Sequence, residues 1–122
     1  MTTSADTIAY HQERSWHFLD LVNDELARGE LEEASNKVWG AAAHAIKAVA
    51  ERRGWEHHAH NLLERAVFRL VHEEHAPRDL LIQYITASAY HQRFYGAPPE
   101  AAYIEAGKEL IAQFIATLES LP

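Results

Sequence analysis

Histidine is the residue type through which this sequence could most readily do chemistry, because it occurs nine times while cysteine is absent. A neutral imidazole ligates metals, and the same ring moves protons near neutral pH. Two closely spaced groups comprise His57, His58, His60, His72 and His75. The last two are three residues apart, a spacing at which imidazoles on one helix can share a metal ion. A metal-binding protein is therefore one hypothesis.

The metal hypothesis lacks a clear third ligand. Catalytic zinc usually takes three protein ligands, so Glu56, Glu64 or a more distant residue would have to complete the set. The run from His72 to His75 is also shorter than the zincin motif, in which two residues separate the glutamate from the second histidine. Solvated histidines in a loop and at a helix end explain the same pattern, and we expect no cofactor.

A second set of side chains is spaced to line a polar pocket around His91. Residues 84, 88, 91 and 95 fall on one face of a helix, and residues from the segment 30–53 would form the opposite wall. The pocket candidates are Ser35, Lys37, Trp39, Tyr84, Ser88, His91 and Tyr95. The alternative is that His91 is a hydrogen-bonded core residue among aromatic side chains.

Glycine and proline residues mark the boundaries of the elements that must position these side chains. Between them, apolar residues recur with helical periodicity, and no alternating strand pattern competes. The expected helices span about 8–28, 30–53, 58–74, 77–95 and 100–118. The sequence therefore predicts an all-α fold, a single antiparallel bundle of about five helices over residues 8–122 that follows a flexible N-terminus at 1–7.

The segment 30–53 is apolar on two sides. One stripe runs through Leu31, Val38 and Val49, and the other includes Trp39 and Ile46. Such a helix is either central in its bundle or shared with a partner, and its alanines allow close approach of neighbouring backbones. Self-association through this helix is thus one prediction, and complete coverage by the chain's own helices is the alternative.

Charge and hydropathy restrict the function classes. The formal net charge is −7, which argues against a broad nucleic-acid surface but leaves a local basic patch open. No apolar run approaches the roughly 20 residues that cross a bilayer, so we expect no membrane association. Residues 1–6 are short and polar, unlike a secretory signal, which predicts a cytoplasmic protein.

Two blocks of sequence resemble a known family. The run Ala34-Ser35-Asn36-Lys37-Val38-Trp39-Gly40-Ala41-Ala42, with Ala45-Ile46-Lys47-Ala48 after it, is similar to the signature of the PaREP1 family. The run Ala89-Tyr90-His91-Gln92-Arg93-Phe94-Tyr95 is similar to its second block. That family in turn resembles the HEPN group of helical domains. The resemblance implies a HEPN-like bundle, frequent dimers and a superfamily that includes RNA-cleaving toxins and nucleotide-associated modules.

Active HEPN domains cleave RNA without metal through an arginine followed roughly four to six residues later by a histidine, which act together on one phosphodiester. Arg93 lies nearest the expected place, but no histidine occurs between it and Pro99. Arg69 and His75 meet the spacing elsewhere in the chain, as do Arg52 with His57 and Arg53 with His58. The catalytic candidates are His91, Arg93, Arg69 and His75.

The missing histidine after Arg93 favours a non-catalytic function. The prediction is a HEPN-like interaction module, dimeric, that binds a protein partner, a nucleotide or RNA, or belongs to a toxin–antitoxin-type system. A metal-independent endoribonuclease and a histidine-based metal-binding protein are the alternatives.

Overall fold

The computed structural model describes residues 2–91 and 99–122, and every regular element in these ranges is a helix. The helices are α1 (Ser4–Ala27), α2 (Leu31–Arg53), α3 (His60–Glu73), α4 (Asp79–Ala89) and α5 (Ala101–Ser120). The predicted all-α bundle of five helices is confirmed. Helix α4 is shorter than expected, because it ends at Ala89 and Tyr90 and His91 form a turn; residue 95, where its end was expected, lies outside the described residues.

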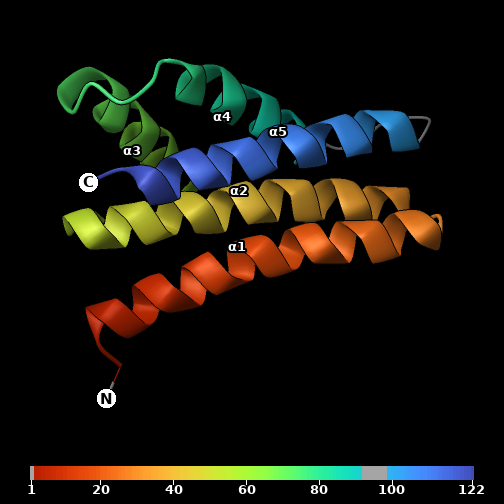
Figure 1. Ribbon diagram of the computed structural model, residues 1–122, viewed down its shortest axis with the longest axis horizontal. Coiled ribbons are helices and arrows are strands. Elements are labelled where there is room, and N and C mark those ends of the chain that lie inside the picture. The colour runs from red at the N-terminus through yellow and green to blue at the C-terminus, as the bar shows by residue number, and fades with distance from the viewer. Residues whose placement is uncertain (1, 92–98) are drawn as a thin grey trace.

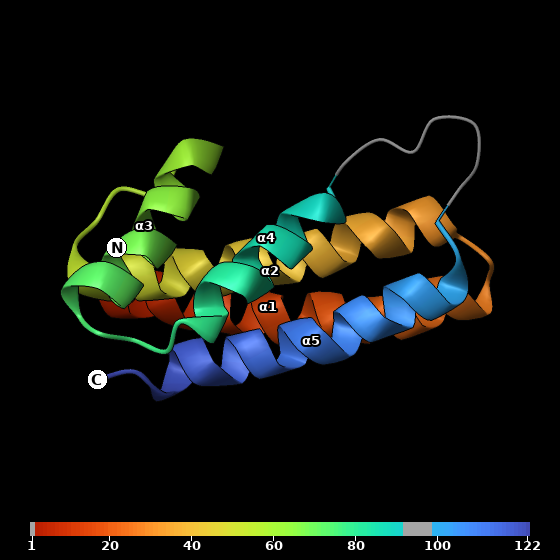
Figure 2. The same ribbon diagram turned by 90° about the horizontal axis from the view of Figure 1, so that it is seen from above.

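Helix α2 lies at the centre of the bundle (Figure 1). Helices α1 and α5 run along α2 and also contact each other, and the shorter pair α3 and α4 lies over α2, with α4 beside α5 (Figures 1 and 2). All four of the other helices contact α2. A helix surrounded in this way must be apolar around most of its circumference, which is the pattern of residues 30–53.

Both apolar stripes of α2 are covered within the chain. Val38, Ile46 and Ala50 are fully buried, and Trp39 and Ala43 keep only 8% and 9% of their surface exposed. The second stripe is therefore occupied by α3 and α4, and it offers no apolar surface to another molecule. The prediction of self-association through this helix loses its structural basis.

Helix α1 begins at Ser4, four residues before the start expected at about residue 8. Thr3 is the N-cap of a capping box in which its hydroxyl accepts from the Asp6 backbone N–H at 3.0 Å. The Asp6 carboxylate accepts from the Thr3 backbone N–H at 3.1 Å. These reciprocal bonds satisfy two N–H groups of the first turn, so most of the segment expected to be flexible, residues 1–7, is helical.

Two glycines allow aromatic rings to lie directly on helix backbones. A Cβ atom at Gly40 would lie 2.6 Å from Cδ2 of Phe18, so the absence of a side chain lets the α1 ring approach α2. Gly107 on α5 likewise leaves room for the ring of Tyr90, which an added methyl group would overlap. Within the described ranges, no helix is both long and apolar enough to cross a membrane.

Candidate functional site

Four aromatic side chains from separate parts of the chain meet where α2, α3 and α4 converge. Trp39 comes from the middle of α2, His60 from the first turn of α3, Tyr84 from α4, and His91 from the segment after α4. Trp39 and Tyr84 are buried, whereas both histidines are exposed. We call these four residues the aromatic site.

The two imidazoles lie close to the indole and to each other. The centroid of the Trp39 ring is 4.8 Å from that of His60 and 5.5 Å from that of His91, and the two histidines are 6.1 Å apart. Three such similar distances form a triangle, which a sandwich of the indole between the histidines would not give. The imidazole planes differ by only 25° and both histidines are exposed, so we call the two imidazoles beside the buried indole the platform.

Tyr84 helps to hold His60 and Trp39 in place. Its hydroxyl hydrogen-bonds Nε2 of His60 at 3.3 Å, and its ring meets the indole edge-on, with centroids 6.1 Å apart. Burial is the main cause that raises the pKa of Tyr84 to about 12, with the nearby Glu64 carboxylate adding to it. The hydroxyl therefore keeps its proton at neutral pH and remains a hydrogen-bonding group rather than a charge.

The position of His91 is fixed by the residue before it. The buried Ser35 hydroxyl on α2 donates to the carbonyl oxygen of Tyr90 at 2.9 Å. The hydroxyl of Tyr90 donates to the backbone carbonyl of Tyr103 on α5 at 2.6 Å, and the two tyrosine rings stack. Ser35, expected to line the pocket, instead anchors the backbone that presents His91.

Two other pocket candidates form contacts away from the aromatic site. Lys37, expected on the wall opposite His91, extends toward α1 and forms an ion pair of 2.8 Å with the nearly buried Glu25. Ser88 donates to the carbonyl of Ile85 within its own helix at 3.0 Å. Tyr95 and the catalytic candidate Arg93 lie outside the described residues.

The metal-ligand candidates do not form one cluster. His60 belongs to the aromatic site, and Nε2 of His57 is 2.8 Å from the Glu51 carboxylate. His72 stacks on Phe68 near the opposite end of α3. In the part of the chain that the structure describes, no three histidine, aspartate or glutamate side chains converge as a metal ion requires.

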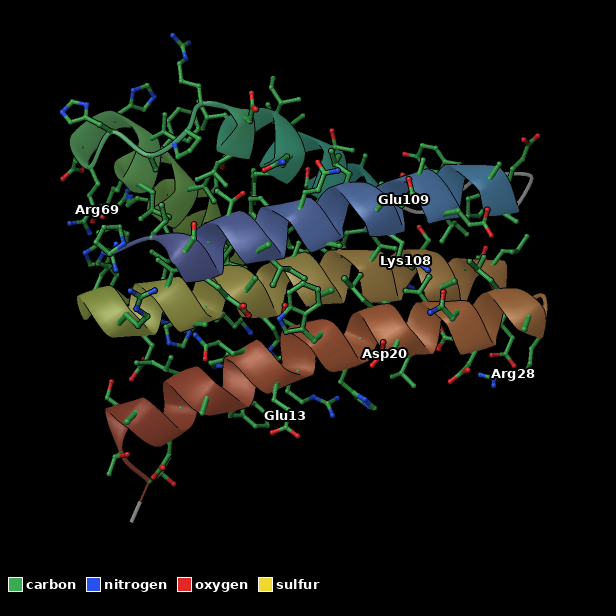
Figure 3. All side chains as sticks on the ribbon, in the orientation of Figure 1. Glu13, Asp20, Arg28, Arg69, Lys108 and Glu109 are labelled. Carbon is green, nitrogen blue, oxygen red and sulfur yellow. The ribbon has the colours of Figure 1, made fainter. Side chains whose placement is uncertain are left out.

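The catalytic candidate Arg69 lies far along α3 from the aromatic site. Nine residues separate it from His60, which is about 13 Å of helix rise. Its guanidinium is 3.9 Å from the centre of the Trp55 ring, and its Nε is 3.3 Å from the Glu73 carboxylate (Figure 3 labels Arg69 at this end of the molecule). His75 lies beyond the end of the helix and lines a separate cavity with His72 and Arg78.

Comparison with known families identifies the chain. The model of the archaeal PaREP1/PaREP8 family matches residues 10–114. The chain belongs to that family. No curated protein and no solved structure matches it. The family match spans α1 to most of α5, and so it includes all four residues of the aromatic site.

This PaREP1/PaREP8 family member also contains a histidine pair that sequence spacing did not reveal. The Nδ1 atoms of His11 on α1 and His44 on α2 are 2.9 Å apart, and His57 meets the His11 ring edge-on. Burial is the main cause that lowers the pKa of His44 to about 4, and the adjacent His11, Lys47 and Arg14 lower it further. The pair spans 33 positions of sequence, so no local motif could indicate it.

Proposed function

We propose that this protein is a non-catalytic helical interaction module that binds a planar aromatic group, such as a nucleotide or RNA base, at the aromatic site. The observation that carries the proposal is the exposed platform of His60 and His91 next to the buried Trp39 indole. Stacking of a base on a protein aromatic ring contributes about 1–3 kcal/mol and tolerates any base. Because Tyr84 and the Tyr90 anchor hold the rings, little conformational freedom is lost on binding.

The non-catalytic character is supported by the surroundings of the platform. Among the described residues, the guanidinium groups that contact aromatic rings are those of Arg14 and Arg69, on Phe18 and Trp55 respectively. Arg52 donates to the Leu121 carbonyl, and Arg53 pairs with Glu74. Neither contact involves His57 or His58, the histidines that follow these arginines at the RNase spacing. In an arginine–histidine RNase the arginine stabilises the developing phosphate charge, and the described contacts of Arg52, Arg53 and Arg69 do not involve His60 or His91.

The direct test is a titration observed at the tryptophan indole N–H groups by NMR, with adenosine and a short single-stranded RNA as ligands. The three tryptophans give three indole signals, and the signal that disappears in Trp39→Phe is that of Trp39. We expect the Trp39 signal to shift while those of Trp16 and Trp55 stay in place. His60→Ala and His91→Ala should each weaken binding at least about five-fold. The control is His72→Ala, which removes a histidine that stacks on Phe68 and should leave binding unchanged.

The same preparation separates binding from cleavage. Incubation with single-stranded RNA and no added metal should leave the RNA intact. Cleavage that disappears in His91→Ala or His75→Ala would establish the endoribonuclease alternative and reject the non-catalytic proposal. Absence of any shift at Trp39 with adenosine or RNA would reject the aromatic site as a binding site.

We further propose that the module self-associates through α4 rather than α2. Ile82 and Ile85 are 64% and 62% exposed, and their spacing places them on one face of α4. Residues 80–89 contain no acidic or basic side chain, in a chain whose net charge is −7. Two copies with this charge repel each other least where the contact is uncharged. A two-fold antiparallel crossing of α4 helices would pack Ile82 against Ile85 of the second copy.

Light scattering tests this dimer. The mass at tens of micromolar should be that of two chains, and Ile85→Glu should reduce it to one. Ala116→Glu adds the same charge at an exposed position of α5 and should leave the dimer intact. A monomeric wild-type protein would refute self-association, and an Ile85→Glu dimer would refute the α4 contact.

A further inference from the structure

A cavity next to the aromatic site is lined by basic side chains. Its volume is about 180 Å³, and it lies between α2 and the loop that leads into α3. Its polar lining consists of Lys47, His57, His58 and His60, and Trp39 forms part of its wall. No carboxylate is among the described residues that line it. We call this cavity the Lys47 pocket.

The neighbouring cavities differ from the Lys47 pocket in charge. The cavity beyond His58 is lined by Glu51 and Glu56. The one that contains Arg65 and Arg69 also includes Glu56. The cavity lined by His72, His75 and Arg78 also has no acidic side chain, but it lies beyond the other end of α3, away from the aromatic site. The Lys47 pocket favours anions, because the Lys47 ammonium and the imidazole N–H groups offset the desolvation of an anion and no carboxylate lines the pocket among the described residues.

Two of the four basic groups of the pocket are held by contacts outside it. Glu51 fixes the ring of His57 through a contact of 2.8 Å with Nε2, and the Glu51 carboxylate also accepts from the Ser4 hydroxyl. His60 is stacked on Trp39 and hydrogen-bonded by Tyr84. These two imidazoles are therefore prearranged, which reduces the ordering cost when a ligand binds.

We propose that the Lys47 pocket binds the phosphate group of a ligand whose aromatic ring stacks at the aromatic site. This inference rests on the proposed function, and it narrows the ligand to a planar ring that carries a phosphate, as a nucleotide does. The two sites share Trp39 and His60, so a ring and a phosphate a few bonds apart reach both at once. No arginine lines the pocket among the described residues, so the bidentate fork that recognises carboxylates and phosphates alike is missing there. A lysine ammonium binds phosphate as a point charge, and imidazole N–H groups add donors for the phosphate oxygens.

The test compares adenosine 5′-phosphate, adenosine and inorganic phosphate in the indole NMR titration, with backbone amide signals of Lys47 and His58 recorded at the same time. Adenosine 5′-phosphate should bind at least about ten-fold more tightly than adenosine, a difference of about 1.4 kcal/mol. Lys47→Gln should abolish this difference. Lys108→Gln removes a lysine that instead bonds Asn23 on α1, and it should preserve the difference.

Competition experiments identify the anion. Inorganic phosphate should displace adenosine 5′-phosphate and shift the amides of Lys47 and His58, whereas acetate at equal concentration and ionic strength should do neither. Equal competition by acetate would overturn the phosphate assignment. Circular dichroism melting of Lys47→Gln should match wild type, and if that variant unfolds, Lys47→Arg provides a charge-preserving comparison that should retain phosphate binding.

The two proposals fail in different ways. If adenosine and adenosine 5′-phosphate bind equally and Lys47→Gln changes neither, the Lys47 pocket is refuted while the aromatic site stands. If inorganic phosphate shifts Lys47 and His58 but adenosine never shifts Trp39, the shared-ligand inference and the aromatic site are both refuted, and only a phosphate site remains.

Discussion

At the scale of single residues, the end of α3 contains a backbone conformation that does not suit its side chain. His75 has φ of 59°, the only positive φ among the described residues other than glycine. The Ala76 N–H returns to the Leu70 carbonyl, six residues back, at 2.9 Å, and the left-handed His75 lies directly before Ala76. Gly54 is the left-handed residue directly after α2, with φ of 74°.

His75→Gly should therefore stabilise the protein, by about 0.5–1 kcal/mol, because glycine adopts the left-handed region without a Cβ penalty. Urea denaturation at pH 7 measures the change. Gly54→Ala is the matched control and should destabilise by a similar amount, since nothing lies within 4 Å of its added methyl and only the backbone strain remains. A loss of stability in His75→Gly would show that the imidazole makes a compensating interaction.

Part of the aromatic site could be anticipated from individual residues, and part could not. Tyr84 and His91 are seven residues apart, a spacing that predicted one shared helix face; α4 ends before His91, yet both side chains lie beside Trp39. His60 was expected among metal ligands because spacing describes neighbours in sequence, whereas its partners come from α2 and α4. The direction of Lys37 depends on Glu25 in another helix, which no periodicity reveals.

At the scale of elements, the packing of α1 on α2 includes the hydrogen-bonded imidazoles of His11 and His44. One Nδ1 must donate and the other accept, so both rings cannot be protonated at once without breaking the bond. Burial is also the main cause that lowers the pKa of His11, followed by the charges of His57 and Lys47. The interface therefore favours the uncharged pair.

Stability should fall as the pH decreases from about 6.5 toward 4. The pKa of His44 is about 4 in the folded protein and near 6.5 when unfolded, so between these values the unfolded chain binds more protons. After allowance for partial exposure, we expect a loss of about 1–2 kcal/mol from this pair. Urea denaturation at several pH values measures it, and His44→Gln should flatten the profile.

The control for this pH effect is His17→Gln, which removes an exposed histidine of α1 and should keep the wild-type slope. Other groups titrate in the same range, so the informative quantity is the difference between variants. Equal slopes in wild type and His44→Gln would contradict the assignment to this pair.

The helices themselves were largely predictable because their ends are marked locally. Gly29 and Gly54, both with positive φ, follow α1 and α2 as the sequence indicates. The exposed face of α4 was not predictable, because apolar periodicity shows that Ile85 lies on an apolar stripe but not whether another element covers it. Coverage is a property of the assembled bundle.

At the scale of the whole molecule, the three long helices pack along one another, whereas the shorter α3 and α4 make fewer contacts with the rest of the bundle. Helices α1 and α5 run along α2 (Figures 1 and 2), and Val38 and Ile46 of α2 and Phe114 of α5 are fully buried. Helices α3 and α4 leave Phe68, Ile82 and Ile85 largely exposed. The sequence indicated the central helix by its two stripes, but the choice between internal coverage and a partner required the packing of all the helices.

This division predicts unequal protection from hydrogen exchange. Amides of α2 should exchange slowest, near the rate set by global unfolding, and those of α3 and α4 should exchange sooner through local opening. The aromatic site joins the two parts, because Trp39 lies in α2 while His60 and Tyr84 lie in the less protected pair. Exchange measured by mass spectrometry with and without adenosine 5′-phosphate should therefore show added protection in α3 and α4 and little change in α1. If α3 and α4 were already as protected as α2, the bundle would open as one unit, and binding could slow their exchange only through global stabilisation, which would protect α1 equally.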